Sequence, residues 1–188
     1  MAIKIFIDQA HNPDGFPDSG ETGYNLRENE ITYAVGKYLE GFLRNDPRFE
    51  VMLSRPEPDT VVGTDAASSR EERVRMANEW PADFFISLHT NTDLDTQKRG
   101  AEVFIKQYNT LPNWFGSNIM NGILQMTSSV DGGIHEGEFY TLNAVNTPSI
   151  ILSLGYLSNI TDANILRDEQ YRFAHGIYRG MLEFFGFI

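Results

Sequence analysis

Short apolar runs alternate along this sequence with longer segments in which apolar residues recur every three or four positions. The β-branched and aromatic runs predict strands over Ile3–Ile7, Phe49–Leu53, Asp83–Leu88, Ala101–Ile105 and Ser149–Leu152. The helical spacing predicts helices over Glu28–Leu43, Ser69–Asn78, Pro112–Met126, Asp162–Leu166 and Asp168–Phe185. With no repeat or linker, this alternation indicates a single three-layer α/β domain over residues 1–188 with a mostly parallel sheet.

Some details of the helices can also be predicted. Ser69 followed by Glu72 resembles a capping box at the start of the second helix. We expect Arg73 to anchor that helix through a salt bridge. Trp114 and Phe115 fit the core face of the third helix better than a sugar-binding platform.

Polar residues stand where three of the predicted strands end. His11 lies just past the first strand, His89 follows the Asp83–Leu88 strand, and Ser153 ends the strand that begins at Ser149. Parallel sheets gather functional groups at the carboxyl ends of their strands. The chain has four histidines, and two of them fall at matched strand ends, which makes this edge of the sheet a candidate site.

The histidines suggest a metal site. The chain has no cysteine, so two histidines need a carboxylate to complete the three protein ligands of a catalytic zinc ion. Glu28 is the best candidate because its helix begins directly after the loop of His11, with Glu21 and Glu30 as rivals. A carboxylate at a helix N-terminus is also favourable without a metal, so the spacing alone leaves both interpretations open.

Composition limits the partners. The net charge of −11 argues against a nucleic-acid partner, and no run approaches the roughly 20 apolar residues of a membrane span. The opening MAIKIFID fits a core strand better than a secretory signal. Either the protein has no export signal, or the chain begins after one was removed.

Several segments, in order along nearly the whole chain, share motifs with one enzyme family. The segments are DQAHN around His11, RENE around Glu28, EERVRMAN, ADFFISLHTN around His89, GAEVF, and TPSIILSLGYLSN around Ser153. Together they resemble the zinc-dependent N-acetylmuramoyl-L-alanine amidases of the amidase 3 type, which cleave bacterial cell-wall peptidoglycan. The fold that the resemblance implies is a mixed sheet with helices on both faces.

The resemblance implies one catalytic Zn²⁺ ion held by His11, Glu28 and His89. The implied reaction is hydrolysis of the amide between N-acetylmuramic acid and L-alanine of the stem peptide. Asn91 and His135 are the expected substrate contacts, although a loop histidine with no such role is the plainer reading of His135. The implied location is the cell wall, outside the cell or in the periplasm, and we expect a monomer.

The position of the general base departs from the family, and so do Gln9, Ala10 and Asn12 in the first motif, where the family has Pro, Gly and Gly. Ser153 stands where the family has its general-base glutamate, and a serine hydroxyl cannot replace a carboxylate base near neutral pH. In one interpretation another carboxylate serves as the base, with Glu138 or Glu136 nearest in sequence. Alternatively, this is an ordinary amidase with an inactivating substitution, or a non-catalytic pseudo-amidase that binds zinc and peptidoglycan. The retained motifs favour the first two interpretations.

Overall fold

The computed structural model describes all 188 residues. Its strands are β1 (Ile3–Gln9), β2 (Thr22–Gly23), β3 (Leu26–Arg27), β4 (Phe49–Leu53), β5 (Phe84–Asn91), β6 (Ala101–Ile105), β7 (Asp131–Glu136) and β8 (Ser149–Tyr156). Its helices are α1 (Glu28–Arg44), α2 (Ala66–Glu79), α3 (Leu111–Met126), α4 (Tyr140–Ala144), α5 (Ile160–Asp168) and α6 (Gln170–Phe184). Every predicted element is present, together with β2, β3, β7 and α4, which the apolar pattern did not predict.

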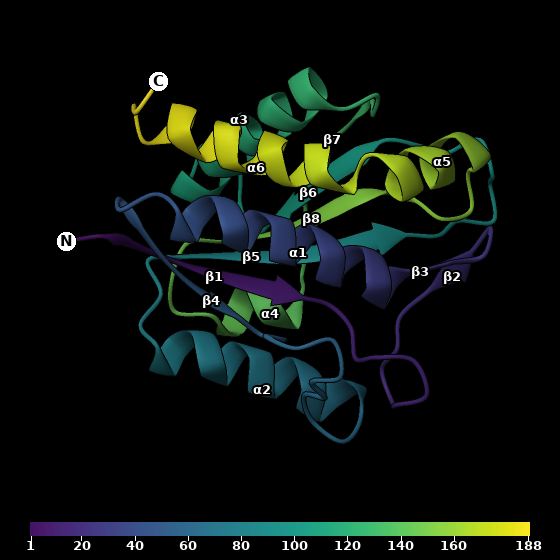
Figure 1. Ribbon diagram of the computed structural model, residues 1–188, viewed down its shortest axis with the longest axis horizontal. Helices are drawn as coiled ribbons and strands as arrows, with labels where there is room; N and C mark the ends of the chain where they lie inside the picture. Colours follow the sequence, from purple (N-terminus) through teal and green to yellow (C-terminus); the bar gives the residue numbers. More distant parts are fainter.

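Six strands form one sheet in the order β4-β1-β5-β8-β6-β7. All neighbours are parallel except β6 and β8, which are antiparallel. Helices α1, α3 and α6 lie on one face of the sheet, and α2 and α4 lie on the other (Figure 1). The predicted α/β domain, with a mostly parallel mixed sheet and helices on both faces, is confirmed.

Alternating side chains divide the core between the two faces of the sheet. Ile5 and Leu88 belong to the larger cluster, under α1, α3 and α6. Phe6 and Phe85 point the other way and stack with ring centres 5.5 Å apart in the smaller cluster beside α2. Only α2 and α4 cover this second face (Figure 1). The polar residues on it therefore have room for a site beside them.

Glycines let α3 and α6 pack very closely. A Cβ atom at Gly180 would lie 2.3 Å from the carbonyl oxygen of Asn118, and one at Gly122 would lie 2.2 Å from that of Gly176. Real Cβ atoms do not approach backbone that closely, so larger residues at these positions would push the two helices apart.

Strands β5 and β8 are longer than predicted, so His89, Asn91 and Ser153 lie inside strands and not just past their ends. The reason is that β8 lies between β5 and β6 and pairs with both, which continues the hydrogen-bonded ladder past the apolar run. His89 and Ser153 are direct partners in this register.

The predicted capping box at the start of α2 is wrong. The helix begins earlier, and Asp65 caps it by accepting hydrogen bonds from the backbone N–H groups of Ala67 and Ser68. Ser69 is buried instead, and its hydroxyl accepts a hydrogen bond from Arg73 Nε.

Two further expectations need correction. Trp114 is 62% exposed, and only its neighbour Phe115 packs in the core. The glycine-rich segment around His135 is the edge strand β7, not a loop, because it pairs in parallel with β6.

None of the helices combines the length and apolar character needed to cross a membrane.

Candidate metal centre

Three potential metal ligands meet where β1 and β5 end and α1 begins. One donor atom each from His11, Glu28 and His89 lies within 4.8 Å of the others. His11 Nε2 lies 3.3 Å from Glu28 Oε2, and His89 Nδ1 lies 3.0 Å from Glu28 Oε1. The glutamate is buried, whereas the imidazoles are 22% and 28% exposed, so the cluster is open to solvent on one side.

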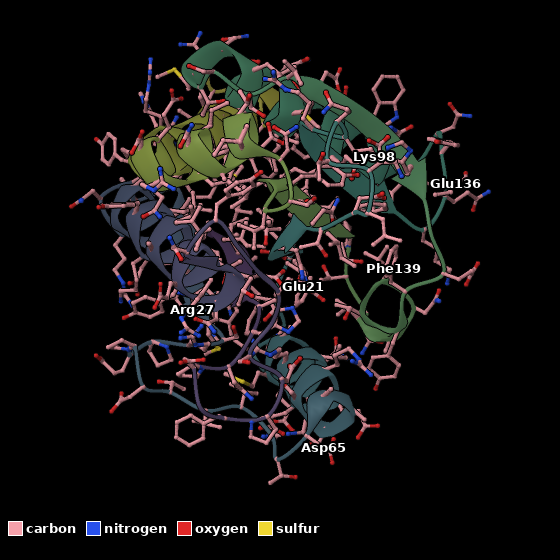
Figure 2. The ribbon with its side chains drawn as sticks, turned by 90° about the vertical axis from the view of Figure 1, so that its right-hand side faces the viewer. Glu21, Arg27, Asp65, Lys98, Glu136 and Phe139 are labelled. Carbon is pink, nitrogen blue, oxygen red and sulfur yellow. The ribbon has the colours of Figure 1, made fainter.

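The fold fixes the Glu28 carboxylate from two directions. Its Oε2 accepts a hydrogen bond from the backbone N–H of Glu21 at 2.9 Å, and its Oε1 accepts one from that of Thr90 at 3.0 Å. The side chains of Glu21 and Glu30 are exposed, so neither rival joins the cluster. Figure 2 looks onto this end of the molecule, with Glu21 near the middle of the view.

Asp18 orients the His11 ring. His11 Nδ1 lies 2.6 Å from Asp18 Oδ1, and since a carboxylate only accepts, Nδ1 donates to Asp18. Nε2 is then the ring nitrogen that faces Glu28. A carboxylate behind a ligating histidine is the usual outer support of a protein metal site.

Two buried arginines hold the chain on either side of His11. Arg55 Nη1 donates to the carbonyl oxygen of His11 at 2.8 Å. Arg73 Nη1 donates to the carbonyl oxygen of Gln9 at 2.9 Å and to Asp8 Oδ1 at 2.7 Å. The expectation that Arg73 anchors its helix through a salt bridge is confirmed.

The pKa values of His11 and Glu28 are both shifted by their mutual contacts. Burial lowers the pKa of His11, but hydrogen bonds to Asp18 and Glu28 outweigh burial and raise it to about 9. Burial raises the pKa of Glu28, but the imidazoles of His11 and His89 outweigh burial and hold it well below its usual range. A metal ion would displace the proton that the cluster otherwise attracts.

The donor set fits a single zinc-type ion, because two imidazoles and a carboxylate leave a fourth tetrahedral position open.

The loop before α1 packs directly against the cluster at Gly20. A Cβ atom at Gly20 would lie 2.8 Å from both Glu28 Oε2 and His11 Cδ2, and this residue has φ of 79°. Glycine therefore allows the loop before α1 to close against the ligands.

Ser153 lies next to the cluster, on the same face of the sheet as His89. Its side chain is buried, and its Oγ has no hydrogen-bond partner. It borders a cavity of about 140 Å³ that is also lined by His89, Asn91, Phe104, Phe139 and Ile151. Ser153 thus lies at the wall of this cavity, although the serine itself is fully buried.

Glu102, which the sequence analysis did not single out, is the partner of Ser153 on the opposite neighbouring strand. Its Oε2 accepts hydrogen bonds from Asn91 Nδ2 at 2.5 Å and from the Tyr156 hydroxyl at 3.0 Å. Burial, followed by this carboxylate, raises the pKa of Tyr156 to about 12. His135 Nε2 lies 3.5 Å from Glu102 Oε1, so both predicted substrate contacts gather around Glu102.

The two carboxylates suggested as substitute bases point elsewhere. Glu136 pairs with Ile105, whose side chain is in the larger core cluster, so Glu136 projects from the face opposite Ser153. It lies at the outer rim of the view in Figure 2. Glu138 is exposed and accepts a hydrogen bond from Asn143 Nδ2 at 3.1 Å.

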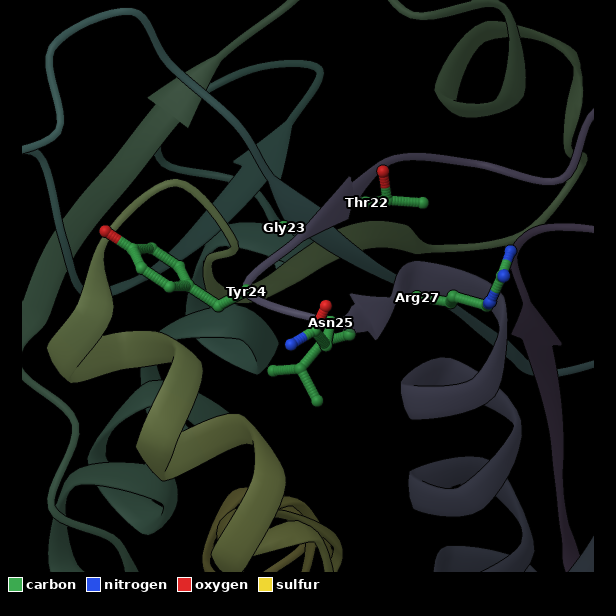
Figure 3. A pocket seen from close by; sticks show the side chains of 6 residues that line it. Thr22, Gly23, Tyr24, Asn25 and Arg27 are labelled. Carbon is green, nitrogen blue, oxygen red and sulfur yellow. The ribbon is translucent and has the colours of Figure 1, made fainter.

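A larger hollow of about 470 Å³ lies at the β2–β3 hairpin and is lined by residues 22–27 (Figure 3). Tyr24 and Asn25 form its turn with φ of 48° and 60°. The lining offers Thr22, Asn25 and Arg27 but no carboxylate or imidazole. It therefore offers no carboxylate or imidazole for acid–base chemistry.

Comparison with known proteins identifies the family. The profile of the Amidase_3 family, N-acetylmuramoyl-L-alanine amidase, matches residues 5–183. The chain is 30% identical over 171 residues to the sporulation-specific N-acetylmuramoyl-L-alanine amidase of Bacillus subtilis (strain 168). It is 31% identical over 180 residues to the N-acetylmuramoyl-L-alanine amidase CwlM of Bacillus licheniformis.

These alignments cover 90% and 95% of the chain but only 62% and 65% of the two relatives, so the chain spans less than two thirds of their length. Among solved structures, the catalytic domain of the amidase CwlV from Bacillus (Paenibacillus) polymyxa var. colistinus superposes with a TM-score of 0.85. The two share 28% sequence identity, and the match covers 98% of each chain. The chain therefore belongs to the Amidase_3 family of N-acetylmuramoyl-L-alanine amidases.

Proposed function

We propose that residues 1–188 form the catalytic domain of a zinc-dependent amidase that cleaves bacterial peptidoglycan. The bond cut is the amide between the lactyl group of N-acetylmuramic acid and L-alanine of the stem peptide. The observation that carries the proposal is the open cluster of His11, Glu28 and His89 in a chain of this family.

His11, Glu28 and His89 would hold one zinc ion. Asp18 would fix the orientation of the His11 ring through its hydrogen bond to Nδ1. When bound, the ion supplies Lewis-acid polarisation of the scissile carbonyl and makes water more acidic. Glu28 stays ionised for this role because its carboxylate is fixed by two backbone amides and two imidazoles.

The substrate lies along the open side of the cluster in this proposal. Asn91 and His135 contact it with polar groups, and Phe104 and Phe139, whose rings are 5.3 Å apart, form an apolar wall. The partner is the peptidoglycan strand with its stem peptide, so the protein acts at the cell wall, outside the cell or in the periplasm. The proposal includes no further subunit.

A second function is a pseudo-amidase that binds zinc and peptidoglycan without cutting. The observation that favours it is Ser153, a buried hydroxyl with no partner at the position where the family resemblance places the general base. Both functions use the same ligands, so zinc content does not separate them.

Digestion of purified peptidoglycan tests the proposal. The zinc-loaded chain should release stem peptides with new N-terminal L-alanine, and chelation or His89→Ala should abolish release. If neither the parent nor Ser153→Glu releases peptide while both still bind peptidoglycan, the pseudo-amidase is correct. Unaltered zinc content in His89→Ala would instead overturn the ligand assignment.

A further inference from the structure

A carboxylate from a neighbouring strand lies in front of β8, close to Ser153. Glu102 belongs to β6, yet its Oε2 accepts a hydrogen bond from Asn91 of β5 at 2.5 Å. Strand β8 lies between these two strands in the sheet, so the Glu102 side chain must cross over β8 to make this contact. Since Glu102 is the register partner of Ser153, the carboxylate crosses near the serine.

The surroundings hold this carboxylate in place. The Tyr156 hydroxyl of β8 donates to the same Oε2 at 3.0 Å, and the side chain is only 14% exposed. With two donors on Oε2, the other oxygen, Oε1, is left to face His135 at 3.5 Å. One oxygen is thus anchored by two neutral donors, and the other faces the His135 imidazole.

We propose that Glu102 is the general base that replaces the carboxylate missing at Ser153. The proposal rests on the proposed amidase function. Glu102 takes a proton from the attacking water as the new C–O bond forms at the scissile carbonyl. It returns that proton to the leaving nitrogen as the C–N bond breaks, which gives the muramic acid carboxylate and the free amine of L-alanine.

Neither of the carboxylates suggested from the sequence, Glu136 at the end of β7 and Glu138 just after it, offers this geometry. Glu136 projects from the other face of the sheet, and the exposed Glu138 is bonded to Asn143 of α4. The Glu102 carboxylate also lies next to Asn91 and His135, the two side chains expected to contact the substrate. A base at Glu102 therefore lies among the groups that would hold the reacting amide.

The test compares the parent with Glu102→Gln, Ser153→Glu and the double variant carrying both changes. Glu102→Gln should lower kcat for peptide release by about 10²–10⁴, the usual effect of losing a positioned base, and leave KM nearly unchanged. Ser153→Glu, which places a carboxylate at the wall of the same cavity, should restore activity to Glu102→Gln. Glu50→Gln, an exposed glutamate of β4 at the far edge of the sheet, is the matched control.

Two measurements apart from activity accompany these rates. Zinc content and the affinity of the zinc-free protein for a muramoyl-peptide fragment should be the same in Glu102→Gln and the parent. A weaker fragment affinity with unchanged kcat would show that Glu102 binds substrate and is not the base.

The outcomes separate this proposal from the function on which it rests. If the parent cuts and Glu102→Gln cuts equally fast, or Glu138→Gln is the inactive variant, Glu102 is not the base although the amidase function stands. If the parent is inert and Ser153→Glu alone cuts, the base is absent and the proposal for Glu102 is overturned. If no variant cuts, the amidase function itself fails.

Discussion

Ser153 lies directly opposite His89 across the paired strands β8 and β5, and both side chains project from the same face of the sheet. Any side chain at this position is therefore a neighbour of His89, one of the three potential metal ligands. Its hydroxyl is buried and has no hydrogen-bond partner, so serine contributes neither a base nor a stabilising contact.

Ser153→Ala should accordingly leave the free energy of unfolding unchanged or raise it by about 1 kcal/mol, because a buried polar group without a partner is costly. Peptide release should match that of the parent if Glu102 is the base. Urea denaturation and peptidoglycan digestion check both statements. A clear loss of stability or of activity would mean that the hydroxyl has a function that its surroundings do not indicate.

Asp18→Asn should weaken zinc binding by about 10–100-fold, the usual effect of losing an outer carboxylate behind a ligating histidine. The hydrogen bond from His11 Nδ1 to Asp18 would no longer be made to a charged acceptor. Competition with a zinc-sensitive dye measures the affinity. Asp14→Asn, an exposed aspartate paired with Arg27, is the control and should bind zinc like the parent.

The ion pair between Asp8 and Arg73 should govern acid stability, because both side chains are almost fully buried. Burial raises the pKa of Asp8, but the Arg73 charge and hydrogen bonds from Ser87 and Arg73 outweigh burial and lower it. A lowered folded pKa means that the stabilisation is present above about pH 4 and is lost as the pH falls through the folded value.

Arg73→Met should therefore lower the free energy of unfolding by about 3–5 kcal/mol at neutral pH, because it leaves a buried charge without a partner. The difference from the parent should shrink toward acid pH, where Asp8 is protonated in the variant. Denaturation at several pH values measures this. Arg75→Met, whose partners Glu72 and Glu79 are on the surface, should cost less than about 1 kcal/mol.

Gly180→Ala should destabilise the protein by about 1–3 kcal/mol, because the new methyl group would lie 2.3 Å from the backbone of α3. Gly41→Ala is the matched control, since it is also a helical glycine but a Cβ atom there meets nothing within 4 Å. This control should be stabilised by up to about 1 kcal/mol. Equal melting temperatures for the two variants would contradict the close contact between α3 and α6.

The apolar pattern was sufficient to predict most of the elements, and the strand ends together with the family resemblance predicted the ligand cluster. His11, Glu28 and His89 stand near the ends of strongly apolar elements, and the parallel sheet brings those ends together. Strand β7 was missed because its glycines and polar residues lack apolar alternation, and only its pairing with β6 makes it a strand.

Glu102 was missed for a different reason. It lies near the beginning of its strand, where the rule for parallel sheets gives no reason to look for a site. Only the antiparallel pairing of β6 with β8 turns that beginning toward the edge at which β1, β5 and β8 end. Strand direction is a tertiary property that the apolar pattern does not contain.

The antiparallel direction of β6 also affects how the acidic group of such a site can change in evolution. Because β6 runs against β8, each strand presents a side chain to the same small volume of space, and either one can supply an acidic group there. Exchanging a glutamate on one strand for one on its neighbour then requires two amino-acid substitutions, one on each strand.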